Sequence, residues 1–257
     1  MPSPTFHKAG SAVPLGYFPW EAAGLRWLAD APGGAAVVEV LEVDDDHLEL
    51  ARLETVTPSA VAGEAFGARL AATHLAGAPF HGSPPAGWPG DGWLGPLADP
   101  HPLLLRPVAT WGEFFADQRI RPLLEEGQRR GVYDAADRRL FEALADKAAG
   151  GDFDTGDAPS RLHGDLWSGN VMWTPGGVVL IDAAAHGGHR EADLGMFTLF
   201  GAPHLERILA AYDEAAPLAD GWRERLHLHQ VHPLMLHACL FGGSYVEQSR
   251  EAARAWV

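Results

Sequence analysis

The first part of the chain shows one helical and several strand-like patterns of hydrophobic positions. From residue 19 to residue 28, apolar residues recur at helical spacing, with a proline where it suits a first turn. Two runs that alternate apolar and polar residues follow at 36–43 and 47–53, joined by an acidic turn. A short extended piece at 4–9 precedes the helix. We therefore expect a small mixed unit of strand, helix and β-hairpin.

The rest of the chain is mostly helical in pattern. Thr110 and Glu113 form a capping-box pair that predicts a helix start. We expect an irregular ordered loop over 80–107, where Gly, Pro and Trp are frequent without a period, and a linker at 150–159. Helical spacing elsewhere predicts helices at 60–75, 135–148, 192–200, 203–215 and 222–240.

The polar residues with the clearest chemistry surround a predicted hairpin. Two short apolar runs flank the turn at 175–177, and residues equidistant from such a turn face each other across the strands. Asn170 and Asp182 therefore meet at the open end, although eleven residues separate them, counting from 171 to 181. Asp165 lies one short loop before Asn170. We expect two carboxylates and an amide oxygen to converge there.

This set of side chains matches the requirements of phosphoryl transfer. A few hard oxygen ligands that leave positions for phosphate oxygens are what Mg²⁺ prefers, which assigns Asn170 and Asp182 to a metal. A carboxylate with no basic neighbour can take the proton of an attacking hydroxyl, which assigns Asp165 as the base. The alternative is a capped turn, since Asp and Asn are common loop residues, but the surrounding hairpin makes that interpretation weaker.

Lys8 and Glu21 form a second candidate pair. Lys8 ends the first extended piece, and Glu21 lies in the first turns of the first predicted helix. A strand lysine paired with a helix glutamate is the arrangement that positions nucleotide phosphates in kinases. The alternative is a surface lysine and a glutamate favoured by the helix dipole. The scarcity of lysine, two among 19 basic residues, favours the first interpretation.

Three motifs together identify a family resemblance. They are His-Gly-Asp-Leu-Trp-Ser-Gly-Asn at 163–170, Ile-Asp-Ala-Ala at 181–184 and Gly-His-Arg-Glu-Ala-Asp-Leu at 188–194. With them the chain resembles the fructosamine/ketosamine-3-kinases, a branch of the protein-kinase-like fold that includes aminoglycoside and choline kinases. The resemblance implies an α+β fold with a small β-rich N-lobe at 1–55 and a large helical C-lobe at 56–257.

The resemblance also implies an activity and residue roles. The activity is ATP- and Mg²⁺-dependent phosphorylation of a sugar hydroxyl on ketoamines, small or protein-bound, after which the adduct falls apart and frees the amine. Asp165 is then the base, Asn170 and Asp182 the metal ligands, and Lys8 and Glu21 the phosphate-positioning pair. The remaining roles it implies are contacts beside adenine for Ala51 and Leu53, support of the catalytic loop for His163 and Asp193, and shaping of the sugar pocket for Trp167, His189, Arg190 and Glu191.

The family pattern also raises an expectation about the N-lobe. Members normally carry a glycine-containing loop ahead of the lysine, and here seven residues precede Lys8. We expect an apparently truncated N-lobe, a cleft that is open on that side, and weak ATP binding unless the turn at 33–34 or the segment 9–18 closes it.

Composition and charge narrow the class of partner. The chain has 257 residues, 47% of them hydrophobic, which is enough for a substantial core. Its net charge of −15 argues against nucleic acid and anionic membranes as binding partners and favours the binding of cationic small molecules. The lone Cys239 excludes an internal disulfide framework. With no apolar run of membrane-spanning length and no signal-like N-terminus, we expect a cytoplasmic protein.

Two other functions stay open, and one further signal is weaker. The alternatives are an aminoglycoside- or choline-like small-molecule kinase, and a catalytically impaired kinase-fold protein that lacks the glycine-rich loop. Trp167 and the run His189-Arg190-Glu191 favour a ketoamine kinase over the first. The intact Asp165, Asn170 and Asp182 oppose the second. A metal site among His227, His229, His232 and His237 is disfavoured, because no cysteine or acidic residue stands at matching spacing.

Overall fold

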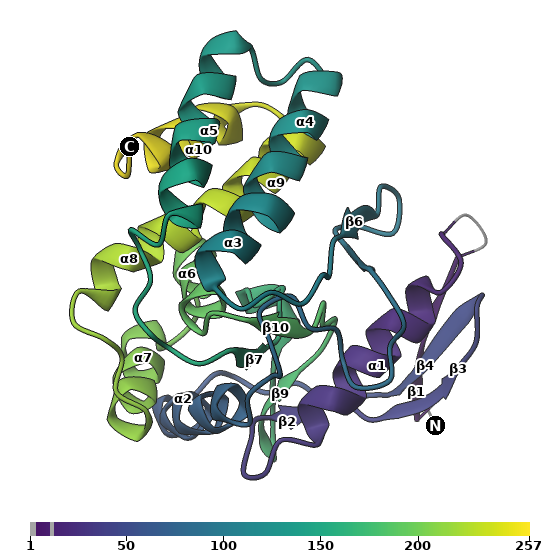
Figure 1. Ribbon diagram of the computed structural model, residues 1–257. Helices are drawn as coiled ribbons and strands as arrows, with labels where there is room; N and C mark the ends of the chain where they lie inside the picture. The colour runs from purple at the N-terminus through teal and green to yellow at the C-terminus, as the bar shows by residue number, and fades with distance from the viewer. Residues whose placement is uncertain (1–3, 11–12) are drawn as a thin grey trace.

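The computed structural model describes residues 4–10 and 13–257 and has an α+β architecture. A small part, with a sheet and one long helix, lies beside a larger helical part (Figure 1). The predicted lobe boundary near residue 55 stays a prediction. The segment 9–18 is one of the two candidates named above for closing the cleft. It includes residues 11 and 12, which lie outside the described residues.

The small part is built on an antiparallel sheet of order β1-β4-β3. Its strands are β1 (Thr5–Ala9), β3 (Val40–Val43) and β4 (His47–Ala51), and helix α1 (Tyr17–Ala29) packs against them. In the register of β1 and β4, Lys8 lies opposite Leu48. The predicted helix and hairpin are confirmed, with α1 starting two residues earlier than expected.

One predicted strand is in fact two. Residues 36–43 divide into β2 (Ala36–Val37) and β3, and β2 pairs in parallel with β9 (Gly177–Leu180) of the large part. The division follows from two adjacent apolar residues, Val37 and Val38, which break the alternation. Val38 is buried, and its N–H donates to the carbonyl of Leu180. The chain therefore joins the two parts before it enters the small sheet.

The large part consists mainly of helices around two hydrophobic cores. Its first helix ends at Leu75, and its amino end is capped by the Ser59 hydroxyl, which accepts from the Ala62 amide. Thr110 caps the next helix by accepting from the Glu113 amide. The helical bounds are α2 (Ala60–Leu75), α3 (Trp111–Phe115), a π-helical turn (Ala116–Ile120), α4 (Arg121–Arg129), α5 (Ala135–Ala149), α6 (Glu191–Phe200), α7 (Leu205–Ala215), α8 (Trp222–His229), α9 (Val231–Phe241) and α10 (Ser244–Arg254).

The predicted hairpin carries the candidate chemistry. Strand β8 (Val171–Thr174) pairs antiparallel with β9, with Val171 opposite Leu180 and Thr174 opposite Gly177. Beside it, β7 (Ser160–Leu162) pairs with β10 (His186–Gly188), which the sequence pattern does not reveal. Asn170 and Asp182 flank the open end of the hairpin, and the Ile181 N–H donates to the Asn170 carbonyl.

Two details of the helical region differ from expectation. The predicted helix 222–240 breaks at Gln230, because Pro233 has no N–H to continue the hydrogen-bond ladder. Helix α10 was not predicted; its buried residues are the small Ser249 and Ala253, which give little hydrophobic periodicity. The loop expected over 80–107 is mostly irregular but contains the short pair β5 (Gly92–Leu94) and β6 (His101–Leu103).

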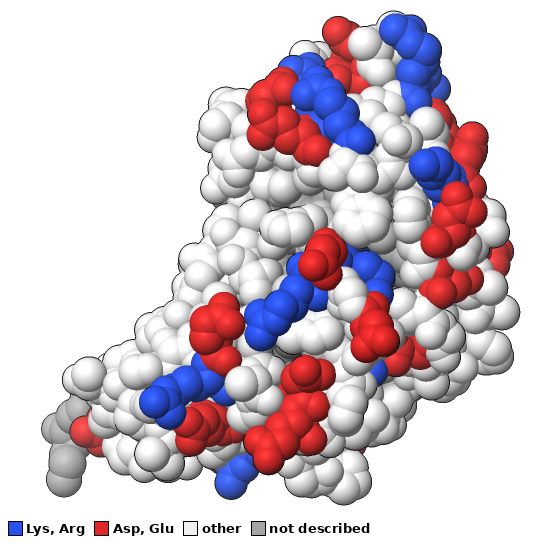
Figure 2. Space-filling view, turned by 90° about the vertical axis from the view of Figure 1, so that its left-hand side faces the viewer, with Lys and Arg blue, Asp and Glu red and all other residues white. Residues whose placement is uncertain are grey.

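The surface carries charges of both signs close together. In Figure 2, basic side chains lie next to acidic ones over the face that is shown, and ion pairs such as Arg207–Glu64 and Arg223–Glu206 link neighbouring elements. Such exposed pairs each contribute little to stability. Across residues 4–10 and 13–257, none of the helices is long and apolar enough to cross a lipid bilayer.

Candidate active site

The loop that follows β7 is held from behind by Asp193 on the first turn of α6. One carboxylate oxygen accepts from the His163 N–H at 2.7 Å, and the other accepts from the Gly164 N–H at 2.9 Å. Burial alone would raise the pKa of Asp193, but hydrogen bonding and the charge of His74 outweigh it and lower that pKa. Asp193 therefore stays ionised and fixes the loop through its backbone.

His163 adds a second support to the same loop. Its Nδ1 accepts from the Asp165 N–H at 3.3 Å, so its Nε2 carries the proton and donates to the Ile181 carbonyl at 2.8 Å. Burial lowers the pKa of His163, which keeps the ring neutral. The loop is thereby tied to the residue just before Asp182.

Gly164 permits the loop to approach the segment between β9 and β10. Its φ is +82°, and a Cβ there would lie 2.1 Å from the Ala184 carbonyl oxygen. Both facts require glycine. The chain therefore turns sharply just before Asp165 and brings that residue to the surface of the cleft.

Asp165 and Asn170 form one hydrogen-bonded unit. The Asn170 Nδ2 group donates to the Asp165 carboxylate at 2.9 Å and to its backbone carbonyl at 2.8 Å. Burial raises the pKa of Asp165 to about 7; the hydrogen bond from Asn170 opposes this rise, and the charge of Asp182 adds to it. A carboxyl with a pKa near neutrality is well matched to proton transfer.

Lys8, Glu21 and Asp182 meet across the cleft from that unit. The Lys8 ammonium donates to both Glu21 oxygens, at 2.8 and 2.9 Å, and to Asp182 Oδ1 at 3.0 Å. Burial opposes a charge on Lys8, but the two carboxylates outweigh it and raise its pKa. The side chains of Lys8 and Glu21 are largely enclosed, whereas that of Asp182 is 41% exposed. The expected pair is therefore a triad that joins β1, α1 and the end of the hairpin.

The oxygens around this cleft fit a divalent cation. Because Asn170 uses its amide nitrogen on Asp165, its Oδ1 is left as an acceptor, and Asp182 has one oxygen beyond the one Lys8 contacts. No hydrogen-bond donor among the described residues contacts either oxygen. Asp182 also has a φ of 54°, a left-handed conformation that Asp and Asn tolerate better than most residues. These two oxygens would hold Mg²⁺ with room for phosphate oxygens.

Three pockets meet at Asp182. One, of about 270 Å³, lies between β4 and the β8–β9 hairpin and is mostly apolar, with Ala51, Leu53 and Met172 in its wall. A small one of about 90 Å³ contains Lys8 and Glu21. The third, of about 490 Å³, opens beside Asp165 and has an aromatic wall formed by Trp167, Phe200, His237, Phe241 and Tyr245. Taken in this order, the three pockets suit a nucleotide base, its phosphates and the molecule that accepts the phosphoryl group.

The structure does not bring His189, Arg190 and Glu191 to the acceptor pocket. These side chains are buried behind the catalytic loop, with exposed fractions of 3%, 8% and 0%. Arg190 pairs with Asp157 at 2.9 Å, and Glu191 pairs with Arg225 at 2.7 Å. Their observed contacts join α6 to the neighbouring elements, and none of the three lines the pocket beside Asp165.

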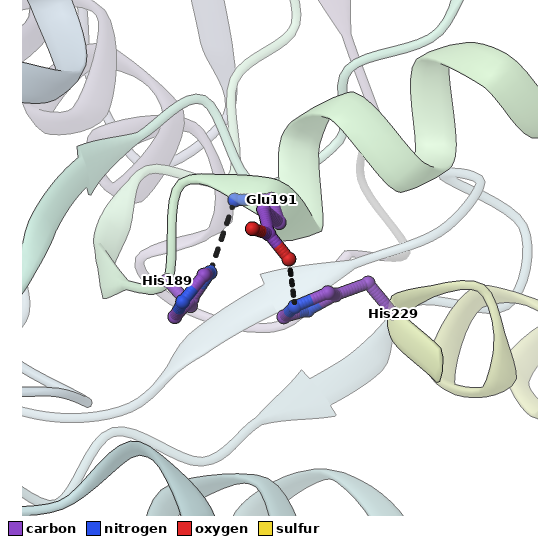
Figure 3. A group of neighbouring side chains, drawn as sticks. All are labelled: His189, Glu191 and His229. Atoms are coloured by element: carbon purple, nitrogen blue, oxygen red, sulfur yellow. Dashed lines mark hydrogen bonds and ion pairs between the residues drawn. The ribbon is translucent and has the colours of Figure 1, made fainter. Parts of the chain in front are cut away.

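His229 lies beside His189 and Glu191 (Figure 3). No acidic residue stands at matching spacing near His229 in the sequence, because Glu191 comes from a different helix. One nitrogen or oxygen from each of the three residues lies within 4.8 Å of the others, which a metal could draw together. However, both Glu191 oxygens already accept from Arg225, at 2.7 and 3.0 Å, and the His189 Nδ1 accepts from the Glu191 N–H. A cation would have to displace a guanidinium, so this cluster fits a structural joint better.

Sequence reasoning missed several residues of the site. The His74 Nε2 donates to Asp193 at 3.1 Å, and its Nδ1 shares a hydrogen bond of 2.7 Å with the Tyr212 hydroxyl, which extends the support of the loop to α2 and α7. Phe200, His237 and Tyr245 complete the acceptor wall from helices distant in sequence. The recurrence of aromatic residues at 237, 241 and 245 is a signal that could have indicated a shared helical face, although α9 and α10 are separate helices.

Comparison with known proteins gives a consistent picture. A family model described as fructosamine kinase matches residues 3–256. A probable ketoamine kinase of Vibrio vulnificus is 32% identical over 142 residues, which are 55% of this chain and 48% of that protein, so the chain matches about half the length of that curated relative. A crystal structure of a candidate fructosamine-3-kinase from Thermobifida fusca is 46% identical with a TM-score of 0.88, covering 98% of this chain and 84% of that one.

A more distant structure bears on the fold alone. A choline/ethanolamine kinase family protein from Mesorhizobium loti is 13% identical with a TM-score of 0.61, covering 99% of this chain and 82% of that one. The kinase-like α+β fold expected from the motifs is therefore confirmed, as is the resemblance on which it rested.

Proposed function

This chain belongs to the fructosamine kinase family, and we propose that it is an ATP-dependent kinase that phosphorylates a sugar hydroxyl of ketoamines. The observation that carries the proposal is the convergence of Asp165, Asn170, Asp182 and Lys8 on one cleft, with pockets on both sides. Each of these residue types has a separate task in phosphoryl transfer. We place the reaction in the cytoplasm, where ATP is available.

The nucleotide would occupy the side of the cleft bounded by β4. The apolar pocket at Ala51 and Leu53 suits the adenine ring, and Lys8 lies where a phosphate would enter the next pocket. Glu21 holds Lys8 in place and is itself buried. When bound through Asn170 and Asp182, Mg²⁺ supplies charge neutralisation for the phosphates.

Asp165 would act on the acceptor. The sugar oxygen attacks the γ-phosphorus, the bond from phosphorus to the ADP oxygen breaks, and the hydroxyl proton passes to the Asp165 carboxylate. Asn170 keeps that carboxylate oriented by its two hydrogen bonds. The catalytic loop needs no movement for this step, because Asp193 and His163 already fix its backbone.

The acceptor pocket supports a ketoamine rather than a bare sugar. Its wall is aromatic, with Trp167 40% exposed and Phe241 59% exposed. Aromatic faces attract cations and stack on flat or apolar groups. A ketoamine joins a polar sugar to a protonated amine, so the sugar would meet Asp165 while the amine side meets the aromatic wall. Phosphorylation would then lead to loss of the sugar and repair of the amine.

The proposal is tested by ADP release with a panel of acceptors. The panel contains fructose- and ribulose-derived ketoamines, an aminoglycoside and choline, each with Mg²⁺ and ATP. We expect turnover with ketoamines and a phosphate on the sugar in the product by phosphorus NMR. Turnover only with the aminoglycoside or with choline would contradict the assignment of the acceptor.

Asp165→Asn provides the matched variant for this assay. It keeps the shape of the side chain but cannot accept the proton, so we expect kcat to fall about 10²-fold or more while nucleotide binding persists. An unchanged kcat would remove Asp165 from the mechanism and leave it a loop residue.

A further inference from the structure

Arg119 is a buried cation that the proposed reaction does not use. It lies on the π-helical turn between α3 and α4, and 4% of the residue is exposed. Single π-helical turns within helices are frequent at functional sites. Among the described residues, none in the pocket beside Asp165 forms a hydrogen bond or ion pair with Arg119, so its burial needs a separate explanation.

The contacts of Arg119 leave its charge uncompensated. Its Nη1 donates to the carbonyls of Leu104 and Gln118, and its guanidinium stacks 4.3 Å from the centre of the Phe114 ring. Its Nη2 has no partner. Within residues 4–10 and 13–257, no carboxylate is in ion-pair contact with it. Asp91, the carboxylate whose charge acts on it, is engaged by Arg106 and by the Leu105 N–H.

A small cavity of about 40 Å³ adjoins this side chain. The polar residues in its wall are Arg119, His186, His189, His229, His232 and Asp193. Asp193 is occupied, since its oxygens accept from two loop amides and from His74. The volume accommodates a few water-sized groups. Apart from the engaged carboxylate of Asp193, the polar side chains of the wall are therefore neutral or positive.

Among the histidines in the wall, His186 offers a guest no donor, because its Nδ1 donates to the Ala184 carbonyl and the Nε2 of the neutral ring is an acceptor. His232 makes no hydrogen bond with the described residues, so either ring nitrogen can carry a proton toward the guest. A buried guanidinium cannot escape its charge by losing a proton, in contrast to a buried lysine or histidine. A mobile counter-ion is the remaining way to neutralise it.

We propose that the cavity beside Arg119 binds a small monovalent anion of the size of chloride. Arg119 supplies the charge, and His232 supplies a ring N–H. The site is separate from the acceptor pocket, with Met196 in the wall of both. Gly164 also lines the cavity, so an ion there packs against the back of the catalytic loop.

The site is tested with the unmodified protein by thermal unfolding in different salts. Sodium chloride and bromide are compared with sodium gluconate at equal ionic strength, because gluconate is too large for the cavity. At ten times the dissociation constant a bound halide should raise Tm by about 3–6 °C over gluconate. Crystals soaked in bromide should show an anomalous peak beside Arg119. Equal Tm in all salts with no bromide peak would overturn the proposal and leave a water-filled cavity.

Variants separate a specific site from a general salt effect. Arg119→Met should abolish the difference between halide and gluconate, and Arg119→Lys should retain part of it. Arg121→Met is the matched control, since it removes the same charge two residues away, where Arg121 pairs with Asp117, Glu142 and Asp146. The control should keep the full halide effect. A bromide peak elsewhere, or an equal loss in the control, would contradict the assignment to Arg119.

Discussion

Asp182 combines two roles that a single substitution can separate. It accepts from Lys8 through one oxygen and offers the other to a cation, and its backbone has a φ of 54°. Asn tolerates this left-handed conformation, whereas Ala would add strain. Asp182→Asn should therefore fold normally and lose about tenfold or more in affinity for a Mg²⁺–nucleotide complex, because one carboxylate charge is gone.

Calorimetry with and without Mg²⁺ measures this change. The substitution should lower the affinity for the metal-free nucleotide less than it lowers the affinity for the Mg²⁺–nucleotide complex. Asp165→Asn serves as the control, since it removes a carboxylate from the same cleft without removing a proposed metal ligand. If Asp182→Asn bound the complex as tightly as the parent, the cation would have to lie elsewhere.

Tyr245 tests the amine side of the acceptor pocket. Its ring packs 5.0 Å from His237 and faces the same cavity as Trp167. Aromatic contacts of this kind contribute about 0.5–1.5 kcal/mol beyond burial, so Tyr245→Ala should raise KM for a ketoamine of phenylalanine about tenfold, with kcat little changed. A ketoamine of glycine is the control substrate and should be nearly unaffected. Equal effects on both substrates would mean that Tyr245 does not contact the amine side.

At the scale of elements, sequence patterns predicted the helices and hairpins whose formation depends on residues close together in the chain. Helix α2 was predicted to the residue, because Ser59 caps a run with clear helical spacing. The hairpin β8–β9 and the meeting of Asn170 with Asp182 followed from turn chemistry and register. Pairings between distant segments were not predictable. The parallel contact of β2 with β9 depends on two residues, Val37 and Val38, whose partners lie over 140 positions away.

Within the site, the same difference between local and distant contacts decides which residue placements the spacing could predict. Asp165, Asn170 and Asp182 lie within one hairpin and its approach, so spacing sufficed to bring them together. The place of His189, Arg190 and Glu191 depends on Arg225 and Asp157, which come from other elements. No local pattern could show that these polar residues are paired and buried.

The contacts of Glu191 on α6 with Arg225 and His229 on α8 should make the stability of the protein depend on pH. Burial opposes ionisation of Glu191, but its hydrogen bonds with His229 and Arg225 outweigh it and lower its pKa to about 2. Its unfolded value is about 4.3, so the folded state binds the proton less readily. The stabilisation is fully present above about pH 4.5 and is lost as the pH falls toward 2. Its size is about 2–3 kcal/mol.

Glu191→Gln isolates this contribution, because glutamine resembles the protonated acid. The free energy of unfolding in urea should differ between parent and variant by the full stabilisation of about 2–3 kcal/mol at pH 6. This difference should shrink between pH 4.5 and pH 3. Glu142→Gln is the control, since Glu142 pairs with Arg121 on a solvated surface and should give a small effect at every pH. A constant difference for Glu191→Gln would place its effect in packing rather than charge.

At the scale of the whole molecule, the two parts share structure. One hydrophobic core combines Phe18, Leu25 and Leu48 of the small part with Ala183 and Ala185 from the segment after the hairpin. The pairing of β2 with β9 and the hydrogen bond from the Val38 N–H to the Leu180 carbonyl add backbone connections. The Lys8–Asp182 contact adds a side-chain one. These contacts lie on the side of the hairpin that carries the proposed metal ligands.

Because of this shared core, we expect the chain to unfold in one cooperative transition. Leu48→Ala removes a fully buried side chain of the small part and should cost about 2–5 kcal/mol. Leu144→Ala is the matched control in the large part, where Leu144 is equally buried. In calorimetry both variants should shift the same single peak, with equal calorimetric and van't Hoff enthalpies. Two peaks, with Leu48→Ala moving only one of them, would mean that the parts fold independently. The cleft between them would then be held together by the Lys8 contact and the bound nucleotide rather than by the core.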